Sequence, residues 1–230
     1  KAVKCVRLGS GQEYGAKAVV LATGSAYRHL GVEGEERLTG HGLSYCATCD
    51  GAFFRDKVIY VIGGGDSALT EALFLTRVGR TVTVVHRRDQ LRASRVLQER
   101  AAAQPNLDFA WNSTVSRVIG ETAVTALELT DTVNGATREV PADGVFVAIG
   151  HEPRTAFLGG QVELDDHGYI VVDGRSSRTS LPGVFACGDA VDHTYRQAIT
   201  AAAAGCHAAL DAQDYLGRID ADAQVAGGTV

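Results

Sequence analysis

The glycine-rich segment at residues 63–68 constrains the fold of this chain more than any other feature. The apolar run at 58–62 predicts a buried strand, and a helix with one apolar face follows the glycines. The spacing Gly63-x-Gly65-x-x-Ala68 suits a turn whose backbone amides approach a pyrophosphate at a helix N-terminus. We therefore predict an α/β dinucleotide-binding domain. The predicted nucleotide-binding residues of the turn are Gly63, Gly64, Gly65, Asp66, Ser67 and Ala68.

The strand predicted at 81–85 is followed by basic residues where an NAD site would place Asp or Glu. A carboxylate there bonds the ribose hydroxyls of NAD, whereas guanidinium groups match a phosphate. The alternative, a solvated basic patch, does not explain the missing acidic residue. We therefore predict selectivity for NADPH. The residues assigned to it are His86, Arg87, Arg88 and Arg92.

Two apolar runs, at 19–24 and 145–150, each end in a small residue, a β-branched residue and Gly. Such runs are typical of parallel strands covered on both faces. Their separation predicts two similar nucleotide-binding units, one inserted into the other. Within the insertion, Asn134-Gly135 predicts a β-hairpin, and a polar helix is expected from about Leu91 to Gln104.

The last third of the chain repeats the order strand, turn and helix. A strand is predicted at 183–187, a long helix from Gln197 to about Leu216, and a frayed tail over 221–230. A carboxylate after a strand can bond ligand hydroxyls, and a helix N-terminus can stabilise negative charge on a reduced flavin ring. The candidate residues are Gly188, Asp189, Ala190, Arg196, Gln197 and Ala198.

Cys46-Ala47-Thr48-Cys49-Asp50 is the redox candidate. Two cysteines three positions apart at a helix start can close a small disulfide, and a thiolate passes reducing equivalents through a mixed disulfide. Asp50 can act as proton donor and acceptor for the departing thiolate. Half of a zinc site and a pair of inert cysteines are the alternatives. A second CxxC or CxxH is lacking, so we predict no metal site.

Composition and cysteine spacing limit the partners and the cellular environment to be expected. The net charge of −5 gives no reason to expect nucleic acid or an anionic membrane as a partner, and no apolar run approaches the roughly 20 residues of a membrane span. Only one of the cysteine spacings is tight, so the five cysteines do not form a disulfide framework, and a reducing, cytoplasmic setting is expected. Cys187 and Cys206 are predicted to be small buried hydrophobic residues. The chain starts at Lys1 and contains no Met, which predicts a fragment.

Taken together, these segments resemble bacterial-type, low-molecular-weight thioredoxin reductases over about residues 19–217. The most specific matches are Cys46-Ala47-Thr48-Cys49-Asp50-Gly51, Gly63-Gly64-Gly65-Asp66-Ser67-Ala68, His86-Arg87-Arg88, Gly150-His151-Glu152-Pro153 and Tyr195-Arg196-Gln197-Ala198. The resemblance implies two Rossmann-like FAD/NAD(P)-binding domains of three-layer ββα type. An NADPH domain with the dithiol, at 27–151, would be inserted in an FAD domain formed by 1–26 and 152–230.

The resemblance also implies the reaction. NADPH reduces FAD, FAD reduces the Cys46–Cys49 disulfide, and the dithiol reduces oxidised thioredoxin. Cys49 would lie nearer the flavin, Cys46 would attack the partner, and Asp50 would be the acid/base. A homodimer is expected. Further cofactor-binding residues implied by the resemblance are Thr23, Gly24, Ile149 and Gly150.

One departure from the family concerns the flavin. The family's first glycine motif, which holds the FAD pyrophosphate, would lie upstream of Lys1, so we expect these 230 residues to bind FAD poorly and to have little reductase activity. Two other functions stay open. The flavoprotein reductase of a peroxiredoxin system shares the dithiol but usually prefers NADH, and a non-catalytic NADPH-binding module would have no need of the cysteines and Asp50.

Overall fold

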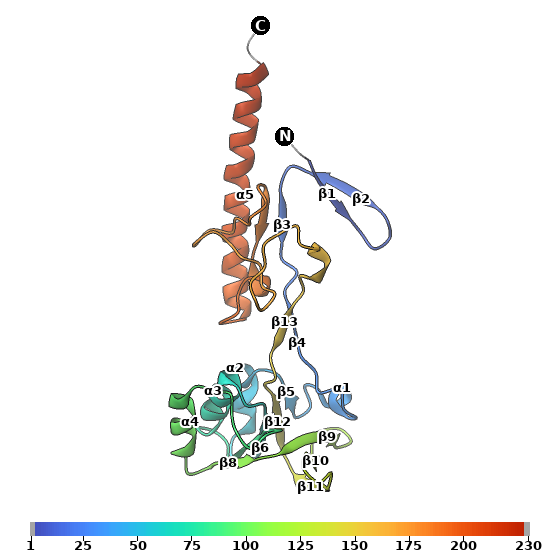
Figure 1. The fold of residues 1–230 in the computed structure, drawn as a ribbon, viewed down its shortest axis with the longest axis vertical. Helices are drawn as coiled ribbons and strands as arrows, with labels where there is room; N and C mark the ends of the chain where they lie inside the picture. Colours follow the sequence, from blue (N-terminus) through green and yellow to red (C-terminus); the bar gives the residue numbers. More distant parts are fainter. Residues whose placement is uncertain (1–2, 228–230) are drawn as a thin grey trace. The chain divides into compact units, whose positions relative to one another are not determined.

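The computed structural model describes the backbone of residues 3–227 and the side chains as far as residue 222. The chain forms two compact units (Figure 1). Tyr27–Gly150 is continuous in sequence and is called the inserted unit below. Lys1–Ala26 and His151–Val230 together form the split unit.

A five-stranded parallel sheet forms the centre of the inserted unit, in the strand order β5-β12-β6-β7-β8. Its strands are almost entirely apolar, because both faces of the sheet are covered. The strands are β5 (Leu43–Ser44), β6 (Val58–Ile62), β7 (Thr81–Val85), β8 (Leu107–Ala110) and β12 (Gly144–Val147).

Helices α3 (Asp66–Leu75) and α4 (Arg95–Ala102) cover one face of this sheet. The antiparallel sheet β11-β10-β9 covers the other, as Figure 1 shows. It consists of β9 (Ser113–Ile119), β10 (Ala126–Asp131) and β11 (Thr137–Pro141). Successive side chains of β6 point to opposite faces of the sheet, so this strand contributes to both cores. Ile59 packs on the helical side and Tyr60 on the side of the small sheet. The inserted unit therefore has three layers, and the predicted ββα fold is confirmed.

Short helices complete the inserted unit: α1 (Glu35–Leu38), α2 (Ala47–Asp50) and the 3-10 helix η1 (Gly51–Phe54). The predicted hairpin at Asn134-Gly135 is confirmed, because β10 and β11 pair on either side of it. The polar helix is shorter than predicted. The backbone amides of Arg92 and Ala93 donate to the carbonyl of Gly64, so this stretch is bound to the glycine turn and the helix begins only at Arg95.

In the split unit, β3 (Val19–Leu21) pairs in parallel with β14 (Val184–Ala186), and α5 (Ala198–Gly227) packs on both. An antiparallel hairpin of β1 (Lys4–Arg7) and β2 (Glu13–Ala16) precedes them. The remaining elements are β4 (Ser25–Tyr27), its partner β13 (His151–Pro153), and the 3-10 helices η2 (Ala156–Leu158) and η3 (Gly188–Ala190).

Helix α5 corrects two predictions. It continues to Gly227, so the frayed tail predicted from residue 221 is wrong as far as 227, and residues 228–230 lie outside the described part. No Pro or Gly interrupts 218–226, which explains the continuation. Cys187 is buried as predicted, but Cys206 is exposed. Ala208, two positions further along α5, faces the core, and residues two apart lie on opposite faces of a helix. None of the described helices has the length and apolarity that crossing a membrane demands.

Candidate active site

The glycine turn lies between β6 and α3, as the sequence predicts. A Cβ atom on Gly63 would lie 2.5 Å from the carbonyl oxygen of Ala148 and 2.7 Å from the Cβ of Ala68, and Gly63 also has φ +153°. A Cβ atom on Gly65, by contrast, would meet nothing within 4 Å. Gly63 therefore allows the chain to pack closely, whereas Gly65 keeps open the space beside the first amides of α3.

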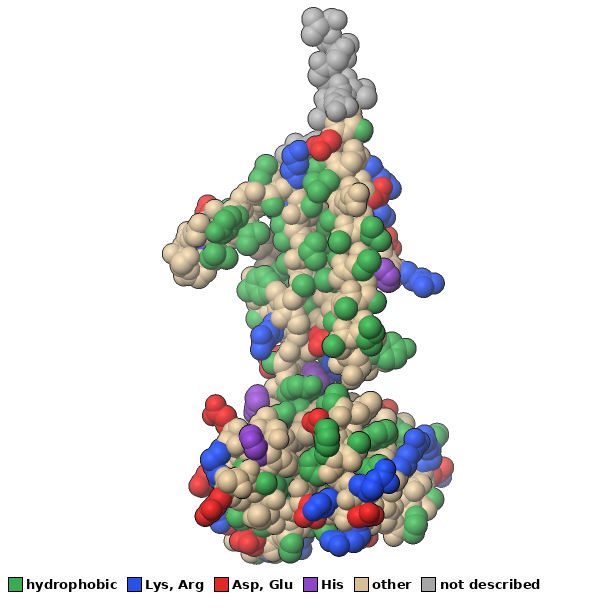
Figure 2. Space-filling model, turned by 180° about the vertical axis from the view of Figure 1, so that it is seen from behind, with side chains coloured by type: hydrophobic (Ala, Val, Ile, Leu, Met, Phe, Trp, Pro, Cys, Tyr) green, Lys and Arg blue, Asp and Glu red, His purple; other side chains and the backbone are tan. Residues whose placement is uncertain are grey.

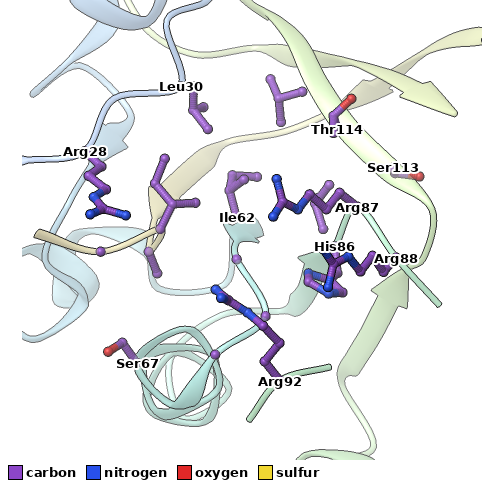
Figure 3. A pocket seen from close by; sticks show the side chains of 18 of the residues that line it. Arg28, Leu30, Ile62, Ser67, His86, Arg87, Arg88, Arg92, Ser113 and Thr114 are labelled. Atoms are coloured by element: carbon purple, nitrogen blue, oxygen red, sulfur yellow. The ribbon is translucent and has the colours of Figure 1, made fainter. Parts of the chain in front are cut away.

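A pocket of about 580 Å³ opens beside this turn and lies entirely within the inserted unit (Figure 3). The guanidinium groups of Arg87 and Arg92 point toward its middle, and Arg28 lies on the opposite side. The predicted residues that line the pocket are Gly63, Gly64, Gly65, Asp66, Ser67, His86, Arg87, Arg88, Arg92, Ile149 and Gly150. Ala68 does not line it and instead supports Gly63 from α3.

The loop that carries the arginines is held by the turn itself. The carboxylate of Asp66 accepts a hydrogen bond of 2.6 Å from the amide of Ser94, while the carbonyl of Gly64 accepts those of Arg92 and Ala93. The Asp66 carboxylate therefore stabilises the loop that carries Arg92. The side chains of Arg87, Arg88 and Arg92 are exposed, with their guanidinium groups available to a phosphate.

His86 differs from its basic neighbours because it is buried. Its Nε2 atom lies 3.0 Å from the carbonyl oxygen of Gln90, and its ring packs so closely on Gly64 that a Cβ there would lie 2.2 Å from Nδ1. Burial lowers the pKa of His86, and the charges of Arg87 and Arg92 lower it further. A neutral imidazole therefore shapes the turn, while the arginines supply the positive charge.

Sequence reasoning missed one basic residue of this pocket and the start of β9. Arg28 lies next to the end of β12, since its backbone amide donates to the carbonyl of Gly150 over 3.0 Å. Ser113 and Thr114 enter from β9. Neither group follows a glycine motif, and only the packing of the layers brings them beside the turn.

The redox candidate forms a disulfide between Cys46 and Cys49, as predicted. Cys46 precedes α2, and the amide of Cys49 donates to Cys46 Sγ over 3.2 Å. The Asp50 carboxylate accepts a hydrogen bond of 2.6 Å from the hydroxyl of Ser44. Within the described part of the chain, no group of three or more His, Cys, Asp or Glu side chains is arranged to hold a metal ion.

In the split unit, parallel pairing brings the ends of β3 and β14 to one edge. Thr23 Oγ1 is buried there and has no hydrogen-bond partner, and Gly24 has φ +70°. Asp189 follows β14. Burial raises the pKa of Asp189, and the nearby charge of Asp192 raises it further. Ligands of open α/β sheets bind at such carboxyl ends of strands.

The remaining predicted residues of this unit surround that edge. Gly188 has φ +68°, and Ala190 is fully buried. Arg196 has φ +48°, and its amide donates to the carboxylate of Asp192. Gln197 precedes Ala198, where α5 begins. Burial, with the positive charge of Arg196, lowers the pKa of His151 to about 4.

Comparisons with known proteins agree with this geometry. The family model described as pyridine nucleotide-disulphide oxidoreductase matches residues 1–205. A thioredoxin reductase of Streptomyces clavuligerus is 54% identical over 97% of this chain and 70% of its own length, and one of Mycolicibacterium smegmatis is 56% identical over 95% and 70%. The crystal structure of thioredoxin reductase from Streptococcus pyogenes superposes with a TM-score of 0.86 at 42% identity, covering 94% of this chain and 72% of that one.

Proposed function

Because the chain belongs to the pyridine nucleotide-disulphide oxidoreductases, and among them to the thioredoxin reductases, we propose that Cys46 and Cys49 carry reducing equivalents from NADPH to the disulfide of a thioredoxin. The observation that carries this proposal is the combination found in the inserted unit. One compact body holds a dithiol in its disulfide form and a basic pocket beside a dinucleotide turn.

The pocket suits NADPH in both charge and shape. The open space at Gly65 accepts a pyrophosphate beside the first amides of α3, and the exposed guanidinium groups of Arg87, Arg88 and Arg92 accept a further phosphate. This arrangement favours NADPH over NADH, and with it a thioredoxin reductase over the reductase of a peroxiredoxin system.

The edge of the split unit suits part of a flavin nucleotide. The buried, unpartnered hydroxyl of Thr23 is what a missing polar ligand would leave behind, and the Asp189 carboxyl group follows β14 at the same edge. When bound, NADPH supplies two electrons and FAD relays them to a disulfide. We propose that Thr23, Gly24 and Asp189 contact the flavin. Weak FAD binding by these 230 residues stays a prediction.

The thiol steps use the chain's own residues. We assign Cys46 as the thiolate that attacks one sulfur of the partner's disulfide, which breaks that bond and forms a mixed disulfide. Asp50 protonates the departing sulfur, and Cys49 then gives a proton to Asp50 and attacks Cys46. The second partner sulfur leaves and takes from water the proton that Cys46 had lost. Two electrons have passed to the partner, and the Cys46–Cys49 disulfide is restored.

We also propose a cytoplasmic homodimer. The support for the homodimer is α5, along which Figure 2 shows apolar side chains and on which Ile199 is 78% and Leu210 59% exposed. Sedimentation of the purified chain tests this, and a strict monomer at micromolar concentration contradicts it.

A trapping experiment tests the thiol roles without any flavin. Cys49→Ser leaves Cys46 free, and we expect it to form a stable mixed disulfide with an oxidised thioredoxin, detected by intact mass. Cys46→Ser is the matched control and should trap far less. Equal trapping by both variants contradicts the assignment of Cys46, and trapping by neither contradicts the proposed partner.

A further inference from the structure

We propose that Ser44 is the positioning residue that holds Asp50 ready for proton transfer at the dithiol. This inference rests on the proposed function, which makes Asp50 the acid/base. Ser44 itself is not expected to touch the reacting sulfur atoms.

A single hydroxyl group connects the carboxylate to the backbone of the dithiol. Ser44 Oγ donates to Asp50 Oδ2 over 2.6 Å and accepts the backbone amide of Cys46 over 3.0 Å. Its distance to the carbonyl oxygen of Cys46 is 3.4 Å, so the short bond to the carboxylate is the better use of its proton. The Ser44 hydroxyl thereby fixes the position of the Asp50 carboxylate relative to the backbone of Cys46.

The sheet fixes Ser44 in turn. Ser44 is only 5% exposed and lies at the end of β5, where it pairs with Phe146 of β12. The amide of Val145 donates to the carbonyl of Gly42, which anchors the start of β5. Ser44 thus belongs to the rigid centre of the inserted unit, whereas Asp50 lies at the end of a helix of four residues. A short helix by itself orients a side chain poorly, so a bond to the sheet is the means of fixing this carboxylate.

No neighbouring charged group competes for Asp50 among the described contacts, so the hydrogen bond from Ser44 is its main described contact. Among the described residues no ion pair includes Asp50. Of the elements packed on α2, η1 carries no titratable side chain and α3 carries Asp66 and Glu71. Asp66 is bonded to the amide of Ser94. Tyr45, beside Cys46, gives its hydroxyl proton to Glu35 and not to Asp50.

The bond has a defined chemical consequence. A hydroxyl that donates to a carboxylate limits the rotamers of that carboxylate. Removal of the hydroxyl therefore leaves the Asp50 carboxylate free to rotate and poorly aimed at the departing sulfur. In the purely structural alternative, Ser44 only accepts the backbone amide of Cys46, and its removal would not alter a step that depends on Asp50.

The test follows the rate at which the pre-reduced chain reduces oxidised thioredoxin, as a function of pH and without flavin or NADPH. We expect Asp50→Asn to slow the reaction about 100-fold and to remove one limb of the pH profile, as loss of a general acid does. Ser44→Ala should slow it about 10-fold, and Ser44→Thr, which keeps the hydroxyl, should restore most of the rate. In the Asp50→Asn background, Ser44→Ala should have no further effect.

A matched control comes from the split unit. Ser177 is 4% exposed, and its hydroxyl donates to Asp211 over 2.7 Å, so Ser177→Ala removes a similar buried bond far along the chain from the dithiol. It should leave the rate and the pH profile unchanged. A wild-type rate in Ser44→Ala, no rescue by Ser44→Thr, or a further loss in the Asp50→Asn background overturns the proposal. If Asp50→Asn itself has the wild-type profile, the proposed role of Asp50 fails, and the fault lies there rather than with Ser44.

Discussion

The nucleotide pocket of the inserted unit and the strand edge of the split unit follow the same strand-and-turn plan, but they differ in how complete they are. In the inserted unit the parts of the pocket stabilise one another, since Asp66 holds Ser94 and Gly64 holds Arg92. In the split unit the edge holds a hydroxyl without a partner, on Thr23, and a half-buried carboxyl group with a raised pKa, on Asp189.

The difference teaches how each site depends on its ligand. Most of the pocket of the inserted unit comes from residues 62–92, joined by 28–30, 113–115 and 148–150, and hydrogen bonds within the unit hold its loop in place. The edge of the split unit joins two segments that lie far apart in sequence and leaves the Thr23 hydroxyl unsatisfied. In the pocket of the inserted unit, we therefore expect a substitution to change either the folding stability or the nucleotide affinity. At the edge of the split unit, we expect a substitution that raises stability to lower ligand affinity.

The largest effect is expected at Gly63. Gly63→Ala should destabilise the inserted unit by about 2–4 kcal/mol, because its Cβ would meet the Ala148 carbonyl and φ is unfavourable. Gly65→Ala should change stability by less than about 1 kcal/mol yet weaken NADPH binding at least about 10-fold by occupying the open space. Hydrogen exchange measures the first quantity and calorimetry the second. Equal stability of the two variants would contradict the division of roles between the glycines.

The second prediction concerns cofactor choice. Arg87→Ala combined with Arg92→Ala should raise the Kd of NADPH about 100-fold, through the loss of charged hydrogen bonds, and leave that of NADH nearly unchanged. Quenching of the single tryptophan, Trp111, offers a direct titration. The control is Arg95→Ala, since Arg95 is exposed and paired with Glu99. A parallel loss for both cofactors would assign the arginines to the pyrophosphate instead.

The third prediction is a pH dependence in the split unit. His151 has a pKa of about 4 in the folded chain and an ordinary value of 6.5, so its neutral form is favoured by folding. The stability it contributes is complete above pH 6.5 and is lost as the pH falls toward 4, by about 1–2 kcal/mol after allowance for solvent screening. Protection from hydrogen exchange in residues 151–222 reports it. His151→Asn should flatten this dependence, and an unchanged slope would locate its origin elsewhere.

The smallest effect is expected at Thr23. Thr23→Val keeps the shape and removes the unpartnered hydroxyl, so the ligand-free split unit should be unchanged or more stable by up to about 1 kcal/mol. Added FAD should bind this variant more weakly than the wild type, as measured by the quenching of flavin fluorescence. Tighter or equal binding by the variant would show that the hydroxyl does not serve the flavin.

Much of the inserted unit follows from local sequence. The bounds of β6 and β7 agree with the predicted strands at 58–62 and 81–85, because short apolar runs rich in β-branched residues favour buried parallel strands. The close spacing of Cys46 and Cys49 also permits their disulfide, which the resemblance to thioredoxin reductases implies. Each of these features depends on residues close together in the chain.

Tertiary structure decided what depends on distant residues. Helix α4 begins late because Gly64, far upstream, binds the amides of Arg92 and Ala93. Cys206 is exposed because only one side of α5 meets the sheet. The spacing of residues in sequence carries no information on such contacts.

The dithiol shows the same division within a few residues. By itself the sequence determined that Cys46, Cys49 and Asp50 lie close to one another, since all three fall within five consecutive residues. Only the tertiary structure decided that the Ser44 hydroxyl contacts the Asp50 carboxylate, because that bond requires β5 to be seated beside β12. Chain connectivity determines which reactive groups are neighbours, whereas packing determines the direction in which each of them points.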